Sequence, residues 1–135
     1  KRPRTEKKAV IINLGVNDLK NSASYVKYMK KAAANLKKYN CKMYYLSVNP
    51  VNSAMIKSVN GKARTEAQVA AFNKAIYRGL CTGRKTRFTY TNTCTNLQMK
   101  GWTSKKPGTD IYDGLHYSNQ TYLRIFDYCM RYLNR

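Results

Sequence analysis

The single histidine of the chain, His116, stands three residues after an acid in the sequence Asp113-Gly114-Leu115-His116. An aspartate at that distance in a loop can accept a hydrogen bond from the imidazole Nδ1–H, which fixes the tautomer and leaves Nε2 as a base. The chain has only six acidic residues, so an acid beside its only histidine favours a catalytic pair. An ordinary loop histidine, with Asp113 as a turn or capping residue, is an equally good interpretation of this motif alone.

A second polar cluster, Gly15-Val16-Asn17-Asp18, follows the apolar run Ala9–Leu14. Ligands of open α/β sheets bind at the carboxyl ends of the strands, so a side chain placed there can point into a binding crevice. The amide N–H of Asn17 could then stabilise an oxyanion, and Gly15 would let the backbone turn tightly off the strand. Taken alone, Asn17 and Asp18 are more typical of a turn between a strand and a helix.

The elements that would position these motifs alternate between strand and helix patterns. Short β-branched or aromatic runs predict strands, and helical recurrence of apolar residues predicts helices, one of which begins at a Thr65–Gln68 capping box. In chain order we expect a strand over Ala9–Leu14, a helix of about four turns from Tyr25, a strand over Cys41–Val48, a loop over Pro50–Arg64, a helix from Thr65 to near Gly79, a strand over Arg87–Thr91, an irregular segment over Cys94–Asp110 and a last helix capped by Ser118 or Asn119.

This alternation predicts an α/β fold, with a parallel sheet and helices on both of its faces. The first strand is expected to be buried on both faces, because its apolar run is nearly continuous. Three strands are about half of the roughly five or six in a doubly wound sheet, so this strand needs further neighbours. The last helix is expected to carry one apolar stripe, made of Tyr122, Phe126, Cys129 and Leu133.

Together the two motifs resemble two sequence blocks of the SGNH (GDSL-type) hydrolase family. The segment Ile11-Ile12-Asn13-Leu14-Gly15-Val16-Asn17-Asp18-Leu19 is similar to the third block of that family. The segment Asp113-Gly114-Leu115-His116-Tyr117-Ser118 is similar to its fifth block. The resemblance extends from Ala9 onward and corresponds to the carboxyl-terminal part of such a domain.

The resemblance implies a three-layer, flavodoxin-like fold, of which this chain would supply about the last three strands and helices. It implies acyl-ester hydrolysis by a Ser–His–Asp triad, on ester substrates such as acetylated sugars or lipids. Carried over to the matching positions, His116 is the general base, Asp113 orients it, and Asn17 donates a hydrogen bond to the oxyanion. The resemblance implies no metal and no organic cofactor.

The chain departs from the family pattern at the nucleophile. The Ser-bearing first block and the Gly-bearing second block of the family are absent. No serine of the chain sits in a strand-to-helix turn with the neighbours that the family pattern requires. The serines present are Ser22, Ser24, Ser47, Ser53, Ser58, Ser104 and Ser118. Three explanations are open: a carboxyl-terminal fragment of a complete hydrolase, a truncated inactive relative, or the use of another serine. The start at Lys1 and the buried first strand favour the fragment.

Residues 1–135 are therefore interpreted as one domain, the carboxyl-terminal portion of an SGNH-like hydrolase, with residues 1–8 as a basic lead-in. The expected partner is an amino-terminal fragment or separate chain that carries the serine. We expect a neighbouring strand, from that partner or another chain, to cover Ala9–Leu14.

The composition is strongly basic, since 26 Lys and Arg against six Asp and Glu give a net charge of +20. Such a charge predicts attraction to polyanions. The sequence lacks zinc-finger spacing, an RNP-type aromatic motif and a flanked Gly-x-x-Gly clamp, which argues against a nucleic-acid-binding domain. The alternative function is an inactive SGNH-like fold that binds a polyanion or nucleic acid. No run approaches the roughly 18 consecutive apolar residues of a membrane span.

The four cysteines, Cys41, Cys81, Cys94 and Cys129, allow three complete pairings, and their bonding state is left open. Cys81 and Cys94 bracket a Thr- and Arg-rich stretch and could close a short loop, whereas four buried free thiols are the other interpretation. The bracketing pair, the many tyrosines and the high charge favour a secreted or cell-surface protein. With a single histidine and no Cys-x-x-Cys, a structural zinc site is not expected.

Overall fold

The computed structural model describes residues 8–83 and 88–133, which contain one parallel sheet. Its strands lie in the order β1-β2-β3, with bounds β1 (Lys8–Ile12), β2 (Cys41–Leu46) and β3 (Thr89–Thr91). Of the basic lead-in expected over residues 1–8, all but Lys8 lies outside the described residues, as does Arg87 of the expected third strand.

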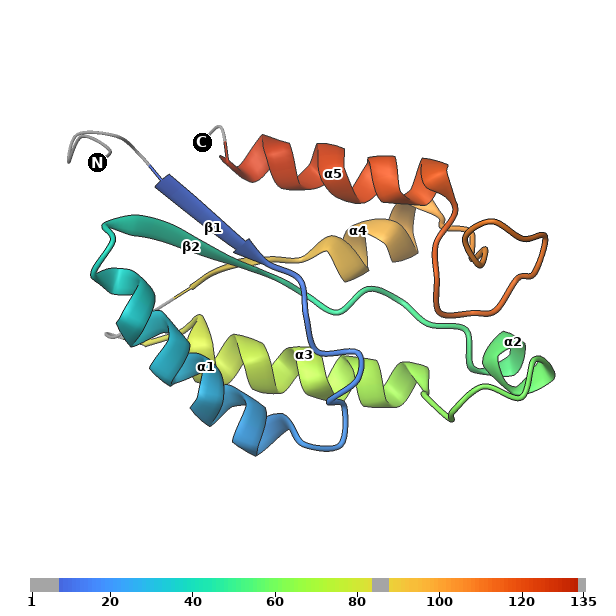
Figure 1. Ribbon diagram of the computed structural model, residues 1–135, viewed down its shortest axis with the longest axis horizontal. Coiled ribbons are helices and arrows are strands. Elements are labelled where there is room, and N and C mark those ends of the chain that lie inside the picture. Colours follow the sequence, from blue (N-terminus) through green and yellow to red (C-terminus); the bar gives the residue numbers. More distant parts are fainter. Residues whose placement is uncertain (1–7, 84–87, 134–135) are drawn as a thin grey trace.

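Helices cover both faces of this sheet (Figure 1). One layer is formed by α1 (Ser22–Lys37) and α3 (Glu66–Leu80), the other by α4 (Thr93–Lys100) and α5 (Asn119–Leu133), and the short α2 (Ser53–Ser58) lies beyond the end of β2. The predicted α/β class is thereby confirmed, and the three layers are consistent with the flavodoxin-type fold of SGNH hydrolases.

The two layers have separate cores, because successive side chains of a strand point to opposite faces of its sheet. Tyr45 of β2 belongs to the larger core, where it packs with Phe72 of α3 and is fully buried. The next residue, Leu46, belongs to the smaller core, which it forms with Leu97 of α4 and Ile125 of α5. β2 is therefore packed between helices on both faces of the sheet, which fixes the position of the segment that follows it.

The start of α3 has the capping box that the sequence predicts. Thr65 Oγ1 accepts a hydrogen bond from the N–H of Gln68, and Gln68 Oε1 accepts one from the N–H of Thr65, both at 3.1 Å. The box satisfies two of the free N–H groups at the helix start.

Two helices lie where the sequence predicted a loop and an irregular segment: α2 lies within residues 50–64, and α4 begins at Thr93 and takes up the start of residues 94–110. Each begins at an asparagine, because the side chains of Asn52 and Asn92 accept a hydrogen bond from the N–H three residues on, at 3.1 Å. Asparagine is among the strongest N-cap residues, so both helices had a signal in the sequence.

The expectation that the first strand is buried on both faces is wrong for the part of the chain that the structure describes. Here β1 is an outer strand: Ile12 packs against the larger core, whereas Ile11 is 41% exposed. Leu14, just after the strand, is 63% exposed. One face of β1 is therefore covered by α1 and α3, and the other is open.

The expected stripe of α5 is right in its second half, where Cys129 is buried and Leu133 packs against the smaller core, and wrong in its first half. Ile125 and Cys129 are buried against the smaller core, whereas Tyr122 and Phe126 are 44% and 59% exposed. The stripe chosen from the sequence favoured the large aromatic residues, but the smaller side chains are the ones that fit against Leu46.

All four cysteines are free thiols, so the bond between Cys81 and Cys94 that the sequence allowed is not formed. Burial raises the pKa of Cys81 to about 12 and that of Cys94 to about 11. Both thiols therefore stay protonated at neutral pH.

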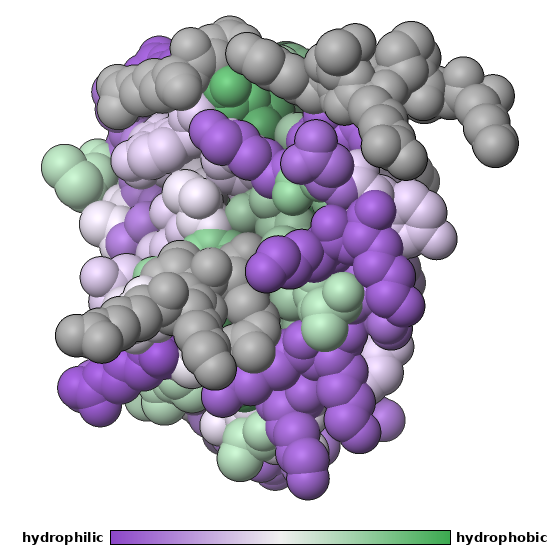
Figure 2. Space-filling view, turned by 90° about the vertical axis from the view of Figure 1, so that its left-hand side faces the viewer, coloured by the Kyte–Doolittle hydropathy of each residue, from purple (hydrophilic) through white to green (hydrophobic). Residues whose placement is uncertain are grey.

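The solvent-exposed side of α1 carries Lys27, Lys30 and Lys31, and the exposed Lys38 follows at the end of the helix. Figure 2 views the side of the molecule on which β1 and β2 begin, and the surface there is mainly hydrophilic. None of the helices in the described residues is both long and apolar enough to cross a membrane.

Candidate active site

A crevice of about 430 Å³ lies where β1 and β2 end. Its walls are residues 13–18 after β1, residues 48–49 after β2, and residues 115–117 of the loop before α5. Asn17 and His116, which the sequence placed in separate motifs, therefore line the same cavity.

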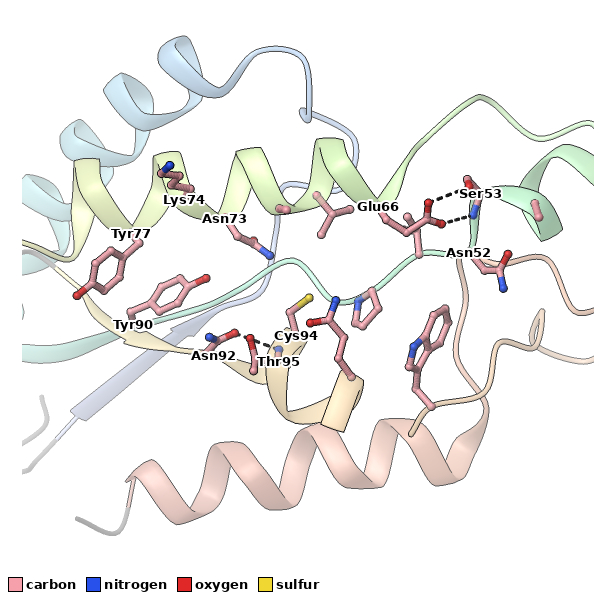
Figure 3. A pocket seen from close by; sticks show the side chains of 17 residues that line it. Asn52, Ser53, Glu66, Asn73, Lys74, Tyr77, Tyr90, Asn92, Cys94 and Thr95 are labelled. Atoms are coloured by element: carbon pink, nitrogen blue, oxygen red, sulfur yellow. Dashed lines mark hydrogen bonds between the residues drawn. The ribbon is translucent and has the colours of Figure 1, made fainter. Parts of the chain in front are cut away.

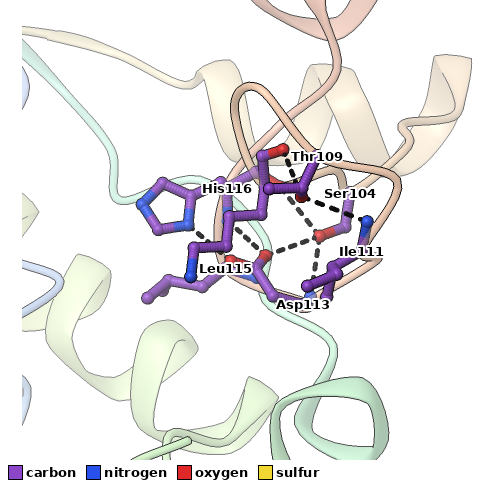
Figure 4. A network of polar contacts seen from close by, with 8 residues as sticks. Ser104, Thr109, Ile111, Asp113, Leu115 and His116 are labelled. Carbon is purple, nitrogen blue, oxygen red and sulfur yellow. Dashed lines mark hydrogen bonds and ion pairs between the residues drawn. The ribbon is translucent and has the colours of Figure 1, made fainter. Parts of the chain in front are cut away.

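Asp113 and His116 form a hydrogen-bonded pair beside this crevice (Figure 4). His116 Nδ1 lies 2.5 Å from Asp113 Oδ2, while Asp113 Oδ1 accepts hydrogen bonds from the N–H groups of Leu115 and His116 at 3.0 and 2.9 Å. Asp113 is buried, whereas the His116 side chain is 45% exposed. The pair therefore has a protected acid and an imidazole that solvent and ligands can reach.

The carboxyl group of Asp113 is ionised at neutral pH. Burial by itself raises the pKa of Asp113, but hydrogen bonds from the His116 ring, from the N–H groups of Leu115 and His116 and from Ser104 outweigh it and lower the pKa to about 2. The carboxylate can only accept, so the Nδ1 atom of His116 must carry the proton that lies between them. Nε2 is then the basic nitrogen of the ring.

Ser104 supports this pair from behind. Its Oγ lies 3.1 Å from Asp113 Oδ1 and 2.8 Å from the His116 carbonyl oxygen, and it accepts a hydrogen bond from the N–H of Gly114 at 2.7 Å. Ser104 is only 3% exposed and forms a β-bridge with Tyr117. Sequence reasoning missed this role, because nothing in the irregular segment around Ser104 marks it as a neighbour of Asp113.

Gly114, between Asp113 and His116, allows the loop to dock on the start of α2. Its φ is +77°, and a Cβ at this position would collide with the carbonyl oxygen of Asn52. The Gly114 carbonyl oxygen in turn accepts a hydrogen bond from the N–H of Asn52 at 2.9 Å. Only glycine combines this backbone conformation with so close an approach.

We expect Gly114→Ala to lower the free energy of unfolding by roughly 2–4 kcal/mol, because it adds a steric clash to a strained φ. Gly108→Ala is the matched control: Gly108 has a similar φ of +71°, but an added Cβ would meet nothing within 4 Å. The control should cost about 1 kcal/mol, from backbone strain alone. Urea unfolding measures both values, and equal losses for the two variants would contradict the close approach at Asn52.

The Gly15–Asp18 motif is held as firmly as the Asp113–His116 motif. Gly15 has a φ of +127°, and a Cβ there would run into the ring of Phe72. The Tyr45 hydroxyl donates to the Leu14 carbonyl oxygen at 2.7 Å, and the N–H of Asp18 donates to the Gly15 carbonyl oxygen at 2.8 Å. Asp18 thus shapes the turn that presents Asn17.

Arg64 orients the amide of Asn17. Its Nη2–H donates to Asn17 Oδ1 at 2.7 Å, and its Nε–H donates to the Val16 carbonyl oxygen at 3.0 Å. Because Arg64 occupies the amide oxygen, the Nδ2–H donors of Asn17 are left for a ligand in the crevice. Sequence reasoning missed Arg64, which is 47 residues away in the chain.

Val48 and Asn49 line the crevice after β2, and a buried asparagine of α3 holds the backbone of Val48. Asn73 Oδ1 accepts from the N–H of Val48 at 2.7 Å, and its Nδ2 donates to the Val48 carbonyl oxygen at 2.9 Å. This pair of bonds replaces a neighbouring strand for the backbone just after β2.

We compared the sequence with curated proteins and with models of protein families. No curated protein matches the chain. The model of one protein family, described as GDSL-like Lipase/Acylhydrolase, matches residues 3–129. The match covers nearly the whole sequence and includes Asn17, Asp113 and His116. The chain therefore belongs to the GDSL-like lipase/acylhydrolase family, as its two motifs had indicated.

Proposed function

We propose that the chain supplies the general base, its aspartate partner and an oxyanion donor to a serine ester hydrolase. The observation that carries this proposal is the pair of His116 and Asp113, whose imidazole lines the same crevice as Asn17. Membership of the GDSL-like lipase/acylhydrolase family supports an ester as the substrate. Acetylated sugars and lipids are the ester classes that we propose.

In the proposed reaction each step of acyl transfer has a residue assigned to it, and the serine comes from outside this chain. A serine Oγ attacks the ester carbonyl while His116 Nε2 accepts its proton, and Asp113 stabilises the imidazolium that forms. The negative charge that develops on the carbonyl oxygen is stabilised by Asn17 Nδ2–H. His116 then gives the proton to the leaving alcohol, and an acyl-enzyme remains. Water attacks the acyl-enzyme with His116 again as base, which releases the acid and restores the serine.

We propose that this serine comes from outside residues 1–135. All seven serines lie within the described residues, and none of them lines the crevice. Ser47 is fully buried near Thr93, Ser104 lies behind Asp113, and Ser118 accepts a hydrogen bond from the N–H of Thr121 at the start of α5.

The surface beside the crevice supports the docking of a serine-bearing segment. Leu14 and Tyr122 both line the crevice and are 63% and 44% exposed. On the same two parts of the chain, Ile11, Leu123 and Phe126 are 41%, 62% and 59% exposed. Exposed apolar side chains that gather in one region mark interaction sites. We propose that a strand pairing with the open edge of β1 covers this surface and brings the serine to the crevice.

Labelling with a fluorophosphonate tests two proposals: that the protein is a serine ester hydrolase, and that its nucleophilic serine lies outside residues 1–135. The protein to use is the longest natural polypeptide or complex that contains this chain, which we term the serine-supplied protein. It should hydrolyse p-nitrophenyl acetate, and the probe should abolish turnover by attaching to one serine. Mass spectrometry is expected to find that serine outside residues 1–135.

The possible outcomes separate the proposals. An adduct on one of the seven serines of this chain would overturn the external nucleophile but keep the hydrolase. Absence of both turnover and labelling would overturn the hydrolase. If such a protein instead binds heparin or DNA with a steep salt dependence, a polyanion-binding module is the better description.

The oxyanion role of Asn17 predicts a graded loss of activity. In the serine-supplied protein, Asn17→Ala should lower kcat for p-nitrophenyl acetate by about 10²–10³-fold, because a donor to the transition state is lost. Arg64→Ala should cost less, about 10-fold, since it only frees the amide to rotate. Lys62→Ala, on an exposed lysine of the same loop, is the control and should be neutral. A larger effect for Arg64→Ala than for Asn17→Ala would contradict the assignment.

A further inference from the structure

Residues 48–54 separate the crevice from a second cavity. The crevice is lined by residues 48–49 of this segment, whereas residues 50–54 line the second cavity, a groove of about 770 Å³. The groove runs between α3 and α4 and passes the outer strand β3 (Figure 3). Neither Asn17, Asp113 nor His116 lines it, so the proposed chemistry does not explain it.

Flat aromatic side chains line this groove. Tyr77 of α3 and Tyr90 of β3 lie together at one end, with ring centroids 5.3 Å apart, and Asn52 and Ser53 lie at the other (Figure 3). Trp102, the only tryptophan of the chain, is a further lining residue. Tyr77 is 47% exposed although it is a large aromatic residue. Tyr77 therefore offers flat apolar area to a ligand, whereas Tyr90 and Trp102 pack partly against the larger and the smaller core and present only part of their rings to the groove.

Polar groups between the rings are free to bind a ligand. Within the described residues, no hydrogen-bond partner is found for the Tyr77 hydroxyl, Trp102 Nε1 or the amide of Gln98. The side-chain oxygen of Asn92 caps α4, which leaves its Nδ2–H donors unused. The groove thus combines hydroxyl, amide and indole groups, which both donate and accept hydrogen bonds.

The groove is nearly neutral, although the chain carries a net charge of +20. Its charged lining side chains are Glu66 and Lys74, one of each sign. The Glu66 carboxylate is already bound by the N–H and the hydroxyl of Ser53, at 2.7 and 2.9 Å. A polyanion would gain little from this lining, in contrast to the exposed lysines of α1.

We propose that this groove binds a neutral oligosaccharide chain. A sugar ring has an apolar C–H face that can lie flat on tyrosine or tryptophan, and equatorial hydroxyls that pair with amide and hydroxyl groups. The groove volume of about 770 Å³ leaves room for several sugar rings. An extended peptide is less favoured, because β3 has only three residues and so offers a short edge for pairing.

Binding in the groove requires no catalysis, so the proposal stands apart from the proposed hydrolase function. The position of Trp102 allows a direct measurement on the chain itself, since excitation at the red edge of the indole absorption, where the twelve tyrosines do not absorb, reports on this one tryptophan. We would titrate the protein with xylohexaose, cellohexaose, mannohexaose and chitohexaose. At least one should give a saturable change in emission, with a dissociation constant of about 1 mM or tighter.

Variants locate the binding site. Tyr77→Ala should weaken binding by about 5-fold or more, because a stacking surface is lost. Gln98→Ala, at an exposed side chain, should weaken it by about 3-fold. Tyr39→Ala is the matched control, since Tyr39 is 65% exposed and does not line the groove. It should bind as the unsubstituted protein does.

Three results would overturn the proposal. One is the absence of a saturable change with all four hexasaccharides up to about 10 mM, while circular dichroism shows a folded protein. Another is an equal loss of binding in Tyr77→Ala and Tyr39→Ala. The last is a response to heparin or polyphosphate alone, which would make the groove part of a polyanion-binding surface. Hydrolysis of p-nitrophenyl acetate, present or absent, decides nothing here.

Discussion

His116→Ala is expected to reduce kcat/KM for p-nitrophenyl acetate by about 10⁴–10⁶-fold in the serine-supplied protein. The imidazole accepts the serine proton and later protonates the leaving alcohol, so its removal disables both half-reactions. Among the described residues, no other histidine lines the crevice, because His116 is the only one in the chain. Initial rates at several substrate concentrations measure the loss.

Two controls separate a catalytic role from a structural one. The N–H groups of Leu115 and His116 still bind Asp113 Oδ1 in His116→Ala, so the loop should keep its shape, and the free energy of unfolding should fall only by the contribution of the lost His116–Asp113 hydrogen bond. Added imidazole should restore part of the activity to this variant, because a small base can occupy the space left in the crevice. Unchanged turnover in His116→Ala would refute the assignment.

Asp113→Asn has the second-largest expected effect, a loss of about 10⁴-fold in kcat. An asparagine amide cannot hold the Nδ1–H tautomer as a carboxylate does, nor can it stabilise the imidazolium. Substrate binding should be affected far less than turnover, since Asp113 does not line the crevice. A change in KM with unaltered kcat would contradict this role.

Asp113→Asn should also change how the free energy of unfolding depends on pH. The folded pKa of Asp113 is about 2 against an ordinary 3.8, so the ionised form stabilises the fold at any pH above the ordinary value. That contribution, about 2 kcal/mol, is lost as pH falls from about 4 to about 2. We therefore expect the difference in free energy of unfolding between the unsubstituted chain and Asp113→Asn to shrink by that amount over this range.

Urea unfolding at pH 7, 5, 3 and 2 measures this difference. Asp110→Asn is the matched control, because Asp110 lies three residues away with a fully exposed side chain, 3.4 Å from Lys105. It should leave the free energy of unfolding nearly unchanged at every pH, since exposed ion pairs contribute little. A difference for Asp113→Asn that stays constant with pH would show that its carboxylate is not specially stabilised.

The local parts of the fold could be predicted from the sequence. The capping box at Thr65 and the extended segments that become β1, β2 and β3 depend on residues close together in the chain, and all are present. The two missed helices, α2 and α4, are short and weakly apolar, so only the asparagines that cap them mark their starts. The first half of the buried side of α5, at Tyr122 and Phe126, was misjudged because periodicity shows that a helix has an apolar face but not which neighbours it meets.

The candidate site likewise has residues that the sequence could identify and contacts that only the structure reveals. The sequence by itself determined that Asp113 and His116 can pair, because three residues of loop bring them within reach, and it selected Asn17 at the end of a strand. Only the tertiary structure decided that both motifs share one crevice. The same holds for Arg64 on the Asn17 amide and Ser104 behind Asp113. The contact of Arg64 with Asn17 spans 47 residues, whereas Ser104 is nine residues from Asp113. The two motifs and Arg64 are distant in the chain, and the packing of helices on both faces of the sheet, rather than any local preference, brings them together.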